Sequence, residues 1–177
     1  MIAISVYGCR KSSPGSAEFI SCYVNGVPKH FTTKFSVSNN YGVSQGYLLH
    51  YISLIAYTDS TDSAEVFSLA IDNKPSLTSN DPGISLVTGA YSFHSPYYSL
   101  DAQYNPPLNL SSQIAFSGGF SQQTYPDTTD FFNLTVTRID STTVTGTFEG
   151  LLYTDKPWLS GPSFVTITSG QFRAKLE

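Results

Sequence analysis

A serine between glycines and three scattered histidines are the first residues whose types suggest chemistry. The segment Gly42-Val43-Ser44-Gln45-Gly46 matches the G-x-S-x-G pattern, in which a strand-turn-helix unit raises a nucleophilic serine above an α/β sheet. No alternation of strands and helices surrounds this segment, so we interpret it as a polar loop. His30, His50 and His94 lack the close spacing, such as H-E-x-x-H, that brings two histidines to one zinc ion.

The thirteen acidic residues do not form a recognisable site either. Asp59, Asp62, Asp127 and Asp130 offer loop oxygens to calcium, but they lack the dense, glycine-spaced pattern of a calcium loop. The two carboxylates of a glycosidase meet only in space, and no motif marks such a pair here. We therefore expect no catalytic centre, no metal and no cofactor, and we expect that the protein is not an enzyme.

Aromatic side chains are the most abundant groups that can bind a ligand. The chain has 12 tyrosines, 12 phenylalanines and one tryptophan among its 177 residues. Rings with polar neighbours can stack on sugars or pack against a partner protein, and the alternative is ordinary packing within a sheet. We take Trp158, in the turn Lys156-Pro157-Trp158, together with Tyr97 and Tyr98 as candidate ligand-stacking residues.

Cys9 follows an apolar run and a small residue, Gly8. This segment resembles the end of a bacterial lipoprotein signal peptide, in which the cysteine is lipidated and becomes the mature N-terminus. The resemblance implies a signal segment over residues 1–8, lipid on Cys9 and a polar tether over 9–17. The apolar run is short for a signal peptide, as expected if Met1 is an internal methionine of a longer, truncated signal. The alternative is a buried first strand, with Cys9 as an ordinary thiol.

The elements that would position these residues have the pattern of β-strands. The chain is rich in β-branched and aromatic residues, which favour strands, and strong helix formers are sparse. Apolar alternations recur about every 8–15 residues between turn signals, as is typical of sandwiches and barrels. We predict one β domain over 18–177, an antiparallel β-sandwich or barrel of about ten strands. The predicted strands are 19–24, 27–37, 47–57, 65–71, 84–93, 97–104, 113–120, 131–139, 144–153 and 163–176.

Three local patterns in the first half of this domain can be checked directly. Asn25-Gly26 predicts a type I′ hairpin turn, because both central residues of that turn need positive φ. Cys22 lies in an alternating apolar run, and we expect it to be a small buried side chain. Periodicity alone allows the run 47–57 to be a helix or a strand, and its three tyrosines favour the strand.

The C-terminal strands make a sharper prediction. By alternation, Phe148 and Phe172 are expected to be core residues of one hairpin. The inward positions of the last strand are odd at Val165 and Ile167 but even from Phe172 onward. One extra residue restores the register, so we predict a β-bulge at Ser169-Gly170, with Gly170 adopting the unusual backbone angle.

Three segments together resemble small lipoproteins of unknown function from Bacteroidota. They are the N-terminal lipidation cysteine, the Ser21–Val27 strand-turn-strand with its Val-Asn-Gly, and the C-terminal pair Val144–Gly150 and Val165–Phe172. The resemblance implies an all-β domain in the bacterial cell envelope, lipid-anchored at the outer membrane, and it carries over no catalytic residues. Arg10-Lys11 stands where surface-exported relatives carry acidic residues, which favours the periplasmic face.

The resemblance also implies O-glycosylation, because secreted proteins of this phylum are modified at Asp-Ser or Asp-Thr followed by an aliphatic residue or threonine. The chain contains four such triplets. The candidate O-glycosylation sites are therefore Ser60, Ser63, Thr128 and Ser141. Ordinary turn formation, in which the aspartate binds nearby backbone groups, explains each triplet equally well.

Charge and hydropathy restrict the partners. The formal net charge is −4 and no basic stripe is present, so we expect no nucleic-acid partner. No apolar run approaches the roughly 20 residues of a membrane-spanning helix, so the lipid is the expected membrane contact. We therefore expect a non-catalytic interaction or structural domain that meets envelope proteins. The alternative is a carbohydrate-binding module associated with glycan uptake.

Overall fold

The computed structural model describes residues 17–44, 47–61, 64–73, 87–92, 98–107, 116–118, 132–154 and 164–176. These described residues form eleven β-strands and no helix. They are β1 (Phe19–Val24), β2 (Val27–Phe31), β3 (Thr33–Ser44), β4 (Tyr47–Tyr57), β5 (Val66–Asn73), β6 (Gly89–Ser92), β7 (Tyr98–Asn105), β8 (Phe116–Gly118), β9 (Phe132–Ile139), β10 (Thr143–Thr154) and β11 (Phe164–Lys175).

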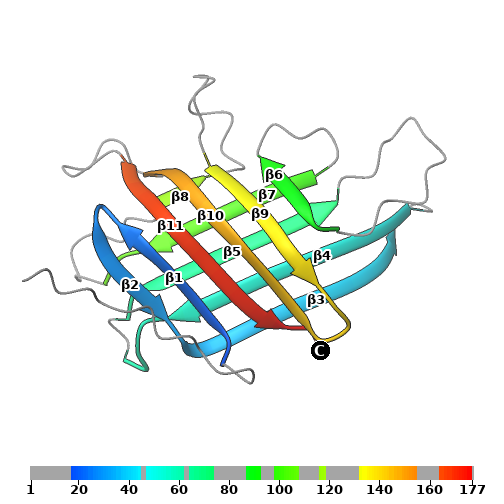
Figure 1. Cartoon of the computed structure of the whole chain (residues 1–177), viewed down its shortest axis with the longest axis horizontal. Coiled ribbons are helices and arrows are strands. Elements are labelled where there is room, and N and C mark those ends of the chain that lie inside the picture. Colours follow the sequence, from blue (N-terminus) through cyan, green and yellow to red (C-terminus); the bar gives the residue numbers. More distant parts are fainter. Residues whose placement is uncertain are drawn as a thin grey trace, which may run out of the picture.

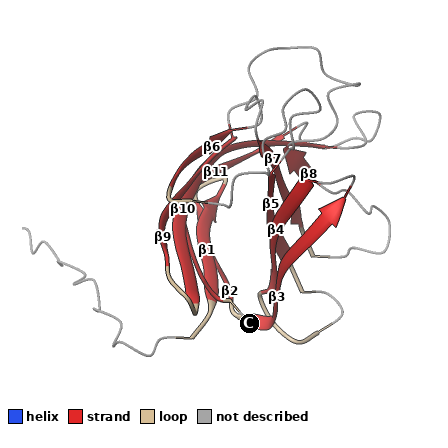
Figure 2. Ribbon diagram, turned by 90° about the vertical axis from the view of Figure 1, so that its right-hand side faces the viewer, coloured by secondary structure: helices blue, strands red, loops and turns tan. Residues whose placement is uncertain are grey.

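The strands form two antiparallel layers that pack face to face (Figures 1 and 2). Layer one has the order β2-β1-β11-β10-β9-β6, and layer two has the order β8-β7-β5-β4-β3. The layers are joined where the end of β10 leaves β9 and pairs with β8, at Tyr153↔Ser117 and Thr154↔Phe116. The sheets do not close around an axis, so the prediction of an antiparallel all-β domain is confirmed in its sandwich form.

The predicted strand 27–37 is wrong as a single element. The chain leaves layer one after Phe31 and enters layer two at Thr33, and the N–H of Thr32 donates to the carbonyl of Tyr57 at 3.1 Å. Lys34 has a φ of 47°, and the β3–β4 register shifts between Thr33 and Ser36. Bulges and bends of this kind let one chain turn the corner between two packed sheets. This division is why eleven strands are present where about ten were predicted.

The local predictions in the first half are confirmed. Asn25 and Gly26 have φ values of 49° and 79°, as a type I′ turn requires. Residues 47–57 form a strand that pairs with β3 on one side and β5 on the other. Ile52, Leu54 and Ala56 are buried between the layers, which is the alternation of a strand with one face on the core.

Aromatic rings connect the two layers through the core. Phe67 of layer two lies 5.5 Å from Phe31 and 5.2 Å from Phe148, both of layer one, between ring centroids. Phe148 also contacts Phe132 at 5.9 Å and Phe172 at 6.5 Å. All five rings are buried, which confirms that Phe148 and Phe172 are core residues. Rings at such separations add attraction beyond the apolar area they bury.

The predicted bulge in the last strand is present, but its unusual angle is at a different residue. Phe148 pairs with Gly170 and Gly150 pairs with Ile167, so two residues of β11 oppose Glu149 alone. The positive φ, 51°, belongs to Ser169 rather than to Gly170. The inward face changes parity there, as the alternation predicted.

Gly170 is required for a different reason, which is the close approach of a ring. A Cβ atom at Gly170 would collide with the carbonyl oxygen and ring of Phe148. A Cβ atom at Gly146, on β10, would likewise collide with the Phe172 ring and with the carbonyl of Thr135. Each phenylalanine of the hairpin therefore lies across the glycine that pairs with it on the other strand.

Candidate functional site

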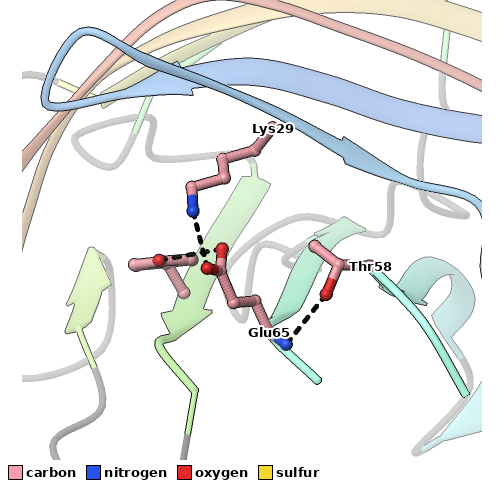
Figure 3. Close-up of polar contacts among 4 residues, drawn as sticks. Lys29, Thr58 and Glu65 are labelled. Atoms are coloured by element: carbon pink, nitrogen blue, oxygen red, sulfur yellow. Dashed lines mark hydrogen bonds and ion pairs between the residues drawn. The ribbon is translucent and has the colours of Figure 1, made fainter. Parts of the chain in front are cut away.

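One group of polar side chains lies between the layers at the edge of the core. Lys29 Nζ of β2 lies 2.6 Å from Glu65 Oε1, and the Tyr104 hydroxyl of β7 donates to Glu65 Oε2 at 3.1 Å. The exposed fractions of the Lys29 and Glu65 side chains are 23% and 12%. Figure 3 shows Lys29 reaching from layer one toward Glu65 of layer two. This ion pair therefore links the two sheets.

The local structure explains why both charged residues point inward. Lys29 pairs with the buried Cys22 of β1 and lies two residues before buried Phe31, so alternation turns Lys29 toward the other layer. Glu65 directly precedes β5, and Thr58 fixes its backbone. The Glu65 N–H donates to Thr58 Oγ1 at 3.0 Å (Figure 3). The Thr58 N–H donates to the Glu65 carbonyl, also at 3.0 Å.

Burial and the Glu65 charge hold the neighbouring groups protonated. Burial, and secondarily Glu65, raises the pKa of the Cys22 thiol to about 12. The same two causes raise the pKa of Tyr104. A thiol in this state is a poor nucleophile and a poor metal ligand at neutral pH, and the tyrosine remains a hydrogen-bond donor. These contacts therefore stabilise the packing of the two sheets. Both carboxylate oxygens, the N–H and the carbonyl of Glu65 each have a hydrogen-bond or ion-pair partner. The expectation that Cys22 is a small buried side chain is confirmed.

Most sequence-predicted site residues lie outside the described part of the chain. These are Cys9, Ser63, Tyr97, Thr128 and Trp158. Only the backbone of Tyr98 is described, as the first residue of β7, where it pairs with Asn73. These assignments stay predictions.

Two of the Asp-Ser-Thr triplets are described, and both have the same turn geometry. Asp59 Oδ1 accepts hydrogen bonds from the Thr61 N–H at 2.7 Å and from Thr61 Oγ1 at 2.5 Å. Asp140 Oδ1 accepts from the N–H of Thr142 at 3.0 Å and from its Oγ1 at 3.2 Å. These bonds lower the pKa of both aspartates, and the central residues, Ser60 and Ser141, are exposed. The turn interpretation is confirmed for these two triplets, while glycosylation of their serines stays a prediction.

A set of exposed rings is a feature that the sequence reasoning missed. Tyr23 of β1 and Phe164 of β11 are each 44% exposed, and both lie on the outer face of layer one. The Phe164 ring contacts Tyr153 of β10 at 6.1 Å between centroids, and Leu151 is half-buried on the same face. We call Tyr23, Leu151, Tyr153 and Phe164, which share this outer face, the aromatic patch. Tyr23 lies opposite Thr168, four residues along β11 from Phe164. Strand alternation was the available signal, because each of these residues is adjacent in sequence to a core residue.

The remaining motifs do not form a site in the described ranges. The interpretation of the G-x-S-x-G segment as a polar loop is wrong for residues 42–44, which are the last three of β3. Ser44 pairs with Tyr47, so an antiparallel strand follows it in place of the helix of a nucleophile elbow. Over the residues that the structure describes, histidine, cysteine and acidic side chains nowhere gather in a group of three that could hold a metal ion. The same residues contain no helix long and apolar enough to cross a membrane. Comparison with known proteins finds no matching family model, no matching curated protein and no matching solved structure.

Proposed function

We propose that this protein is a lipid-anchored, non-catalytic interaction domain of the bacterial cell envelope. The single observation that carries the interaction role is the aromatic patch on the outer face of layer one. Aromatic side chains exposed on the outer face of a sheet are typical of surfaces that meet another molecule. The expected partner is another envelope protein.

The direction of the strands supports this proposal, because the patch lies toward the end of layer one opposite Glu18 and Phe19. β1 begins at Phe19, beside Arg173, and Glu18 Oε1 accepts the backbone N–H of Lys175 at 2.9 Å. Tyr23 lies at the other end of β1, about 13 Å away by strand geometry, and Phe164 is the first residue of β11. The patch is therefore at the end of the strands farther from the proposed anchor.

Site-specific photo-crosslinking in the native envelope tests the interaction role. A photoreactive residue at Phe164 should give a discrete crosslinked product. The same residue at Thr147, which is exposed on the same layer, is the matched control and should give none. Adding Tyr23→Ser and Tyr153→Ser should suppress the Phe164 product. Equal products from both positions, or no product from either, would contradict the proposed interaction surface.

Fatty-acid labelling tests the anchor separately. The gene product expressed from its natural start should incorporate a fatty-acid analogue, and Cys9→Ser should abolish the label. Cys22→Ser is the matched control, because Cys22 is the only other cysteine of the chain, and it should keep the label. Label that survives Cys9→Ser would contradict lipid attachment at this residue. If the wild type is labelled at Cys9, fractionation of the cells tests whether the labelled protein is in the outer membrane.

Carbohydrate binding is the second candidate function, and one observation favours it. The rings of the aromatic patch lie beside Thr166 and Thr168, which pair with Leu151 and Tyr23. Rings beside hydroxyl groups match the apolar faces and hydroxyl edges of sugars. In affinity electrophoresis on a panel of polysaccharides, one polymer should retard the protein, and Phe164→Ala should remove the effect while Thr147→Ala preserves it. Unchanged mobility across the panel would leave the protein-interaction role.

A further inference from the structure

The outer edge of β3 differs from the other strand edges of the sandwich. Within the described residues β3 ends the strand order of layer two, and it pairs only with β4. It is 12 residues long, whereas the edge strands of layer one, β2 and β6, have 5 and 4. A free edge presents a row of backbone donors and acceptors that another strand can use.

The usual protections of an edge strand are absent from most of β3. β2 carries Pro28 and Lys29, a residue without an N–H and an inward-pointing charge, which are two recognised devices against edge pairing. In β3 the bulge is confined to Thr33–Ser36, and the register with β4 is unbroken from Ser36 to Ser44. The sequence of this stretch, SVSNNYGVS, contains no charged residue and no proline.

The β3–β4 hairpin also projects beyond its neighbours. β5 pairs with β4 only from Tyr51 to Tyr57, so β4 residues 47–50 pair with β3 alone among the described strands. In Figure 1 the free end of this hairpin extends past β9 of the other layer. The projecting residues of β4 have the sequence YLLH and carry no acidic residue, lysine or arginine.

We propose that β3 is a self-association edge, through which two copies of this chain pair antiparallel, β3 to β3, about a twofold axis. A second copy is the partner that this edge fits best. An antiparallel strand is complementary to itself, and a charged strand would place like charges opposite one another across the axis, whereas this stretch has none. The pairing extends layer two into one continuous sheet across both copies. It is independent of the aromatic patch, which lies on layer one.

Sedimentation velocity of the 177-residue chain under reducing conditions tests this pairing. The wild type should shift from monomer to dimer as its concentration rises. Ser38→Lys combined with Asn40→Lys puts two charges on β3 and should weaken the association at least tenfold. The matched control is Ser53→Lys with Ser68→Lys, because Ser53 pairs with Ser38 and Ser68 lies one strand further inside the same sheet. The control should still dimerise, and circular dichroism should show that both variants are folded.

A cysteine scan locates the axis and keeps the test independent of the charged variants. Single cysteines at positions 37–43 in a Cys9→Ser background should form disulfide-linked dimers most efficiently at one position, with yields falling on either side. Cys22 is buried and does not compete. A wild type that is monomeric at every concentration that stays in solution would overturn the proposal. Dimers that both lysine variants weaken equally, or a flat crosslinking profile, would do the same.

Discussion

Truncation of Phe148 to alanine is the most direct test of how the two layers are held together. Deleting a buried phenylalanine side chain typically costs about 3–5 kcal/mol. Phe148 contacts three other rings, at centroid distances of 5.2, 5.9 and 6.5 Å, and its ring covers Gly170. Gly170 has no side chain that could fill the space left by the ring. We therefore expect a loss of stability in the upper part of that range, about 4–5 kcal/mol. For a domain of this size that corresponds to a fall in Tm of roughly 8–20 °C.

Urea denaturation followed by circular dichroism measures this loss, and the slope of the transition should stay constant. Thr147→Ala is the matched control, because Thr147 is the adjacent residue and points to solvent on the outer face. It should change the free energy of unfolding by less than about 0.5 kcal/mol. A loss below about 1 kcal/mol for Phe148→Ala would mean that the register of β10 assigned here is wrong.

Three further predictions concern the polar cluster and the bulge. The pKa of the Cys22 thiol is raised in the fold from 9.0 to about 12. The contribution of the buried, protonated thiol to the free energy of unfolding is therefore complete below pH 9 and is lost as pH rises toward 12. The stability difference between wild type and Cys22→Ala, from unfolding curves, should therefore shrink across that window; a constant difference would contradict the assignment. Lys29→Met and Glu65→Gln should each destabilise by about 1–3 kcal/mol. The double variant Lys29→Met/Glu65→Gln should lose less than their sum in a double-mutant cycle, because each single change leaves the partner side chain without its ion pair. Ser169→Gly should stabilise by up to about 1 kcal/mol by relieving the positive φ, and a measured loss would show that the Ser169 side chain makes a needed contact.

The strands were predictable where the pattern is local. The alternation in Phe19–Val24 and the two turn residues after it determine the first hairpin without any distant contact. The same reasoning found the bulge in β11 from a parity change alone. It misplaced the positive φ because glycine is the usual residue for that angle, whereas Gly170 is needed to admit the Phe148 ring. Only the cross-strand partner reveals that requirement.

The contacts between layers were not predictable from local patterns. Nothing in the run 27–37 marks Thr32 as a corner, because alternation reports which face is buried and not which sheet carries it. The pairing of Lys29 with Glu65 joins residues 36 positions apart, and each alone resembles a solvated charge. The aromatic patch escaped notice for a related reason, since tyrosine and phenylalanine occur on both faces of a strand.

The position of β1 has a consequence for the order in which the fold can form. β1 lies between β2 and β11, and Phe19 pairs with Arg173 near the opposite end of the chain. β11 follows all the other described strands in the sequence, so layer one cannot be completed before β11 has been synthesised. Pairing over such a separation must close a very long loop, which slows folding. Until β11 is available, β1 can pair only with β2, whereas β3, β4, β5 and β7 already have their partners. We therefore expect layer one to be completed after layer two during folding.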